Sequence, residues 1–179
     1  MVRNTTTTGA AALAAAALAI AGATVVGHTI PDQHWGTRGA VLDIAFAVAA
    51  VAVAVALPGI AALLQVGRLG RTGTRIAQVG HVAIAVECIA STVHDGNTLG
   101  PVFMLGLLAS IVGLLLLAID GVRAAASRWL APLPLLALVV GIAGGNYGGA
   151  IVIGATWAGL AYAGARDAQP HGELLPAVR

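Results

Sequence analysis

The sequence predicts an all-α membrane protein, a polytopic helical bundle of about six transmembrane helices with both termini in the cytoplasm. Hydrophobic residues make up 59% of the 179 residues and charged residues only 9%, whereas a soluble domain has roughly 45–50% and 25%. So little charge cannot cover a water-exposed surface. The lengths of the apolar segments and the positions of the arginines then give the number and direction of the helices.

The apolar residues fall into six segments. A helix needs about 20 mostly apolar residues to cross a hydrocarbon core of roughly 30 Å, and each segment approaches that length. The segments comprise residues 9–27, 39–66, 76–93, 99–119, 129–144 and 147–165. We therefore expect one transmembrane bundle over residues 1–166 and a short cytoplasmic tail over residues 167–179.

The first segment allows two interpretations. Its alanine-rich run ends in Ala21, Gly22 and Ala23, which resembles the small-residue site of a cleavable signal peptide. The region before this run carries a single basic residue, Arg3, whereas a signal peptide usually begins with a more positive region. We expect the segment to be retained as the first helix.

The second segment alternates valine and alanine over residues 48–56, a period of two that is typical of strands. Its length decides against a strand, because in lipid a single segment satisfies its own backbone hydrogen bonds only as a helix. Pro58 and Gly59 lie near its inner end. They should kink the helix there.

The fifth and sixth segments are short and are joined by the glycine-rich residues 144–149. Glycine adopts the backbone angles of tight turns at low steric cost, so this stretch predicts a hairpin turn. Gly141, Gly145 and Gly149 also recur every four residues. That spacing lets a neighbouring helix approach closely.

The arginines predict the orientation of the helices. If six helices alternate in direction, eight of the nine basic residues fall on one side and only Arg38 on the other. Cytoplasmic loops carry the excess of basic residues, which places both termini in the cytoplasm of a cell-membrane protein. The eight residues are Arg3, Arg68, Arg71, Arg75, Arg123, Arg128, Arg166 and Arg179.

Candidate catalytic residues gather on the outer side of this topology. Glu87, Ser91 and His94 follow the spacing i, i+4, i+7, which places them along one face of the third helix. An acid as deep as Glu87 must be protonated, paired or beside water. We interpret Glu87 as a proton donor or acceptor whose proton is relayed towards His94 and Asp95. Asp43 would be a second acid of the site if the two carboxyl groups share a cavity.

Alternative structural roles remain open for these acids. Glu87 would lock two helices together if its carboxyl group bonded a neighbour. Asp43 lies about one turn into the second segment, where the helix dipole favours an acid. Sequence spacing alone does not distinguish these roles from catalysis.

Aromatic and amide residues are the candidate substrate-binding groups, together with Ser91. Trp35, Tyr147 and Asn146 lie near predicted segment ends on the outer side, where aromatic residues form interfacial belts. Trp157 lies near the middle of the sixth segment. There it either lines a pocket or packs against the many alanines.

Two polar residues nearer the inner side are interpreted as structural. His81, near the inner end of the third segment, is expected to be packed and hydrogen-bonded within the bundle. Asp120 precedes Arg123 by three residues at a helix end, a spacing that suits an interfacial ion pair of small energy.

Several cofactors and partners are not expected. The outer His28, Asp32, His34, His94 and Asp95 lack the tight spacing of a metal site, so they are interpreted as a solvated polar cap. Haem bound by two histidines would need His28 and His94 at equal depth on facing helices, and haem is likewise not expected. The chain has no lysine, which excludes a retinal Schiff base. The arginines follow topology, so the pI near 9.3 does not indicate nucleic-acid binding.

Two resemblances bear on function. The stretch 68–73, RLGRTG, followed by an apolar helix and by Leu99-Gly100-Pro101 at the start of the next, resembles small alanine-rich six-helix membrane proteins of high-GC bacteria without assigned activity. A fainter resemblance is to the small integral-membrane terpene cyclases, whose buried carboxyl groups would correspond to Glu87 and Asp43. That resemblance implies protonation of an isoprenoid epoxide or alkene by buried carboxyl groups.

Three classes of function follow. The first is an intramembrane acid–base enzyme, such as a cyclase or isomerase, whose hydrophobic substrate enters laterally from the outer leaflet and is protonated by Glu87. The second is a non-catalytic membrane subunit, or an immunity or stress factor, that packs against a second copy or a partner through its small residues. The third is a proton or ion pathway, for which the inner half offers only His81, Gln78 and Ser110.

The orientation can be tested by labelling. Cysteines introduced at Thr6 and at Gly172 should be protected from a membrane-impermeant reagent added to intact cells, because both positions are predicted to be cytoplasmic. Labelling of either position from outside would contradict this topology.

Overall fold

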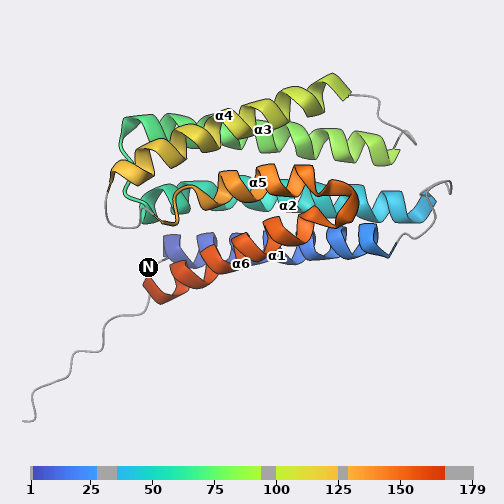
Figure 1. Cartoon of the computed structure of the whole chain (residues 1–179), viewed down its shortest axis with the longest axis horizontal. Coiled ribbons are helices and arrows are strands. Elements are labelled where there is room, and N and C mark those ends of the chain that lie inside the picture. Colours follow the sequence, from blue (N-terminus) through green and yellow to red (C-terminus); the bar gives the residue numbers. More distant parts are fainter. Residues whose placement is uncertain (1, 28–35, 94–99, 125–128, 168–179) are drawn as a thin grey trace, which may run out of the picture.

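The computed structural model describes residues 2–27, 36–93, 100–124 and 129–167. These residues form six α-helices and one 3-10 turn, arranged as a bundle of roughly antiparallel helices (Figure 1). The elements are α1 (Val2–Val26), α2 (Gly36–Leu63), α3 (Arg68–Val93), α4 (Gly100–Arg123), α5 (Leu133–Ala143), η1 (Gly145–Tyr147) and α6 (Gly149–Asp167). The all-α prediction is confirmed.

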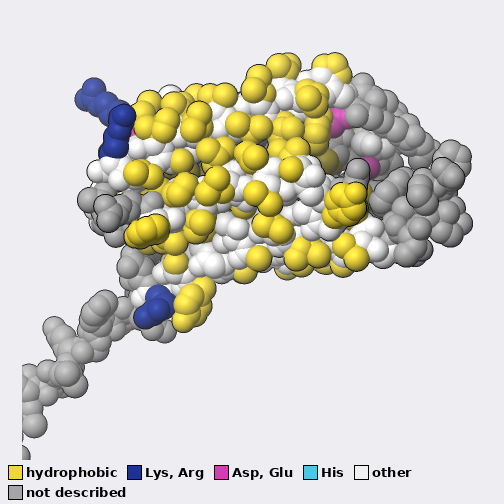
Figure 2. Space-filling view, in the orientation of Figure 1, with side chains coloured by type: hydrophobic (Ala, Val, Ile, Leu, Met, Phe, Trp, Pro, Cys, Tyr) yellow, Lys and Arg dark blue, Asp and Glu magenta, His cyan; other side chains and the backbone are white. Residues whose placement is uncertain are grey.

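Four helices in the described part of the chain are long and apolar enough to cross a membrane. Their spans are Thr5–Val26, Gly39–Leu63, Arg68–Val93 and Gly100–Arg123. Hydrophobic side chains cover the visible side of the bundle (Figure 2), and large ones such as Val79 and Leu105 are two-thirds exposed. An apolar surface of this kind suits lipid and not water, so the bundle has the exterior of a multi-pass membrane protein.

Several helix ends differ from the apolar segments read from the sequence. α3 begins at Arg68 instead of residue 76, and α4 continues to Arg123 instead of ending at residue 119. The apolar runs mark the lipid-facing part of each helix, whereas the helix itself continues through the polar residues at its ends. His81 consequently lies midway along the 26-residue α3, and its expected position near the inner end was wrong.

The fifth predicted segment forms a shorter helix than expected. α5 has 11 residues and begins at Leu133, after Pro132 and with Pro134 in its first turn. Proline is tolerated at the start of a helix but not in its interior, which explains why the helix does not extend back to residue 129. At 1.5 Å per residue α5 is about 16 Å long, roughly half the thickness of a hydrocarbon core.

The predicted turn between the last two helices is present. Gly148 has a φ of +81°, the left-handed conformation that favours glycine. Gly141 and Gly149 face each other across the hairpin, because a Cβ on Gly149 would meet the backbone of Gly141. The turn lies at the level of the last turn of α1, since a Cβ on Gly148 would lie 2.6 Å from Val26.

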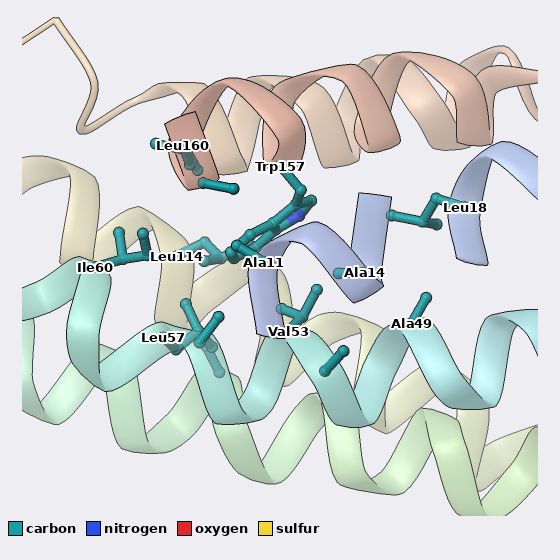
Figure 3. Close-up of a cluster of buried hydrophobic side chains, with 14 of the residues drawn as sticks. Ala11, Ala14, Leu18, Ala49, Val53, Leu57, Ile60, Leu114, Trp157 and Leu160 are labelled. Atoms are coloured by element: carbon teal, nitrogen blue, oxygen red, sulfur yellow. The ribbon is translucent and has the colours of Figure 1, made fainter. Parts of the chain in front are cut away.

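The core is built from alanine faces and one large aromatic residue. Ala11, Ala14 and Ala21 lie on one face of α1 and are fully buried, which lets α1 pack closely on α2 and α6. Trp157 is 2% exposed and extends from α6 into the middle of the bundle, where it lies near Ala11 and Leu114 (Figure 3). This one side chain fills the space that the small alanines leave.

Helices α3 and α4 contact each other through their backbones. A Cβ on Gly80 would lie 2.5 Å from the carbonyl oxygen of Gly106, and one on Gly73 would lie 2.5 Å from that of Gly113. Small residues at such crossings replace the hydrophobic driving force that is missing in lipid with close van der Waals contact. The pair therefore forms a tightly packed unit beside α2.

The carboxylate of Asp120 bonds the start of α3. Its Oδ2 accepts a hydrogen bond of 2.8 Å from the backbone N–H of Gly70, in the first turn of that helix. First-turn N–H groups have no partner inside their own helix, and a negative charge there is also favoured by the helix dipole. Among the described residues no ion pair joins Asp120 to Arg123, so the predicted pairing was wrong.

Pro58 breaks the hydrogen-bond ladder of α2, and a neighbouring helix repairs it. Proline has no N–H, so the carbonyl group of Ala54, four residues earlier, loses its helical donor. The Gln78 side chain on α3 donates a hydrogen bond of 2.8 Å from Nε2 to this carbonyl oxygen. An unsatisfied carbonyl is costly in lipid, so this bond ties α2 to α3 at the proline.

We predict that Gln78→Leu lowers the free energy of unfolding by about 1–3 kcal/mol, because it leaves the Ala54 carbonyl without a donor. In a Pro58→Ala background the restored N–H of residue 58 can donate to Ala54, so the same change should cost much less. Denaturant unfolding in detergent of both single variants and the double variant measures this coupling. Equal losses in both backgrounds would show that Gln78 does not compensate for the proline.

Candidate functional site

A cavity of about 390 Å³ lies inside the bundle. All six helices and the η1 turn contribute residues to its lining. The lining residues are Leu18, Val25, Leu42, Phe46, Ala49, Ala50, Val53, His81, Ile84, Phe103, Leu107, Leu114, Pro134, Leu138, Gly141, Ile142, Gly145, Ala150, Ile153 and Trp157. This volume is within the range of pockets that bind small molecules.

The packing of the helices explains why this space exists. α3 packs along α4, and α1 packs along α2 and α6, but α4 meets the short α5 over only a small area. Ala49 and Ala50 of α2 present small side chains to the gap. The exposed Ile142 and Gly145 also belong to the lining, so the cavity reaches the surface of the bundle near the end of α5.

The lining is apolar except for two side chains, His81 and Trp157. His81 is 7% exposed, and its Nδ1 lies 2.7 Å from the carbonyl oxygen of Ala77 and 3.1 Å from Oγ of Ser110. These contacts fix the imidazole ring between α3 and α4. His81 is thus packed and hydrogen-bonded, as the sequence predicted, and in addition it faces the cavity.

The predicted acids gather at the end of α3 that is opposite the arginines. The side chains of Asp43 on α2 and Ser91 on α3 lie close to each other. Glu87 is 3% exposed and lies one helical turn before Ser91, and Cys88 lies within electrostatic range of both carboxyl groups. The fold thus brings Asp43, Glu87 and Ser91 together in one group, which we call the carboxyl cluster.

The carboxyl cluster is close to the cavity but does not line it. Cys88 packs in a small hydrophobic group against Ile84, Phe46 and Phe103, and these three residues also line the cavity. Neither Glu87 nor Asp43 is among the lining residues. Both phenylalanines of the chain thus line the cavity and pack in the same hydrophobic group as Cys88, the residue that follows Glu87.

The structure places the remaining predicted site residues in different parts of the bundle. Trp157 lines the cavity. Tyr147 is 88% exposed on η1, and Asn146 belongs to the same turn. The candidates His94, Asp95 and Trp35 lie outside the described residues, as do the other polar residues of the outer loops.

Within the ranges that the structure describes, no group of three or more histidine, cysteine, aspartate or glutamate side chains could hold a metal ion. The single cysteine, Cys88, is a buried free thiol within α3.

Sequence reasoning missed the contribution of His81, Phe46 and Phe103 to the cavity. A partial signal exists, because His81 and Ile84 are three residues apart and so share a face of α3. Which neighbours that face meets depends on the rotation and pairing of the helices. Sequence spacing within one helix does not contain that information.

No protein-family model matches the chain, and neither a curated protein nor a solved structure is similar to it. The function is therefore inferred from the geometry of the cavity and of the carboxyl cluster.

We predict that the Ser91 hydroxyl group interacts with the Asp43 side chain and couples α2 to α3 by about 1–2 kcal/mol, as a partly buried bond to an acid would. Asp43→Ala and Ser91→Ala should each lower the free energy of unfolding, and the double variant should lose less than the sum. Unfolding in detergent measures the cycle. Thr156→Ala, on the exposed side of α6, serves as the control; additive losses at Asp43 and Ser91 would contradict the coupling.

Proposed function

We propose that this protein binds a hydrophobic small molecule from the bilayer in the cavity between α2, α4 and α5. The supporting observation is an almost wholly apolar cavity of about 390 Å³ inside a bundle whose exterior is itself apolar. A molecule that dissolves in the hydrocarbon region can reach such a site by lateral movement. The mouth near Ile142 and Gly145 gives the route of entry.

The proposal includes six membrane segments with both termini in the cytoplasm. All described arginine side chains are exposed and lie where α3 begins or where α4 and α6 end, and they gather at one end of the bundle (Figure 2). Basic residues mark the cytoplasmic side. On this orientation the α5–α6 hairpin enters from the cytoplasm and turns near the outer end of α1, and the carboxyl cluster lies in the outer half of the membrane.

Acid–base chemistry on the bound molecule is the narrower part of the proposal. Asp43 and Glu87 supply two carboxyl groups near the cavity, and carboxyl groups are suited to proton transfer in a water-poor site. Because neither acid lines the cavity, the transfer requires that side chains of the lining, such as Phe46 and Phe103, move. A cyclase or isomerase acting on an isoprenoid would use the site in this way.

Binding can be tested by blocking the cavity. Gly145 lines the cavity, and a Cβ added at this position would have no neighbour within 4 Å, so Gly145→Trp adds a large side chain at the mouth without a clash near the backbone. We expect this variant to lose at least tenfold in affinity for tritiated farnesol, measured with protein in lipid nanodiscs. The reason is that the indole ring occupies space the molecule needs.

Gly159→Trp is the matched control. Gly159 is exposed on α6, has equally open space around its Cβ position, and does not line the cavity. Saturable binding that is lost in the Gly145 variant and kept in the Gly159 variant supports the proposal. Equal binding by both variants and the unmodified protein would place the probe elsewhere and contradict it.

A further inference from the structure

The cavity lining contains a hydrogen-bonding side chain, His81, that its own contacts hold in place. Any role of this side chain in ligand choice rests on the proposed binding function. His81 contributes the imidazole ring, and the surrounding lining from α2, α4 and α5 is aliphatic or aromatic. The ring lies midway along α3, so it is about half way through the bundle.

The hydrogen bonds of His81 determine where its proton lies. A backbone carbonyl oxygen only accepts, and a distance of 2.7 Å between Nδ1 and the Ala77 oxygen therefore requires that Nδ1 carries the hydrogen. The Ser110 hydroxyl oxygen, 3.1 Å away, lies beside the same nitrogen. A second proton on the ring would place a charge in an apolar space, which is costly. The neutral ring thus has an unprotonated Nε2.

Nε2 is then a hydrogen-bond acceptor that the protein leaves to the cavity. Within the described part of the chain, His81 makes hydrogen bonds only through Nδ1. The bonds from Nδ1 hold the ring in one orientation, as second partners do for histidines that bind a ligand through the other nitrogen. The other polar side chain of the lining, Trp157, carries an N–H group that only donates. Among the lining side chains, Nε2 of His81 is therefore the group that can accept a hydrogen bond from a ligand.

We infer that the cavity takes an apolar molecule that carries a hydrogen-bond donor, such as the hydroxyl group of a long-chain or isoprenoid alcohol, and that Nε2 of His81 accepts this hydrogen bond. A molecule of the same shape without a donor would cover Nε2 and leave it without a partner. Leaving a buried acceptor unsatisfied costs affinity, whereas a bond to a neutral acceptor in an apolar site gains it. Selection by such a group is stronger than selection by an apolar wall.

The test compares farnesol with farnesyl methyl ether. The ether keeps the chain and the oxygen, which Trp157 could still bond, but it lacks the hydroxyl hydrogen. In competition against tritiated farnesol on nanodisc-embedded protein, we expect farnesol to bind about tenfold more tightly than the ether, as a lost bond to a buried acceptor predicts. His81→Leu should bind both with similar affinity, because it removes the acceptor and keeps an apolar lining.

The outcomes separate the two proposals. Equal affinity of the unmodified protein for alcohol and ether, with binding still blocked in the Gly145→Trp variant, would overturn the role of His81 and leave the binding function intact. Preference for the alcohol that survives in His81→Leu would also overturn it. Failure of both molecules to bind saturably would instead contradict the binding function. Since His81→Leu also removes the bonds to Ala77 and Ser110, the comparison in the unmodified protein decides the matter if that variant does not fold.

Discussion

In hydrocarbon, every backbone N–H and C=O group needs a partner within the protein, and the other features of this bundle depend on that requirement. It explains why the valine–alanine alternation of α2 gives a helix and not a strand. It also explains the repair at Pro58, where Gln78 reaches from α3 to the carbonyl oxygen of Ala54. At the start of α3, the carboxylate of Asp120 likewise accepts a hydrogen bond from the N–H of Gly70. Polar side chains are scarce in this chain, and several of them satisfy backbone groups.

The second determinant is the size of the side chains between helices. Glycine at positions such as Gly80 and Gly106 brings α3 and α4 into backbone contact, and alanine does the same for α1 against α2 and α6. The short α5 has no such seam with α4. Close packing in two places and a gap in a third leave the cavity between them, and Trp157 fills part of the remaining centre. The cavity is thus a consequence of unequal helix packing.

The candidate site consists of two chemically different regions side by side. One is an apolar space lined by His81, in which we propose that a hydrophobic molecule binds. The other is the carboxyl cluster, where Asp43 lies near Ser91 and Glu87 lies one helical turn before Ser91. Phe46 and Phe103 line the cavity and pack in one hydrophobic group with Cys88, the residue after Glu87. A reaction that used both regions would require side chains at this boundary to move.

Local chemistry in the sequence determined the helices, the glycine turn before α6 and the location of the arginines at one end. The helices depend on the length of the apolar segments, the turn on the backbone freedom of glycine, and the orientation on charge. Each of these properties belongs to a short stretch of sequence and needs no contact between helices. The tertiary structure alone decided that His81 lines a cavity, that Asp120 accepts a hydrogen bond from Gly70 of α3, and that Asp43 lies near Ser91. Each of these contacts joins different helices, and an apolar helix in lipid has many rotations of similar local energy. Only the packing of small residues against each other selects one of them.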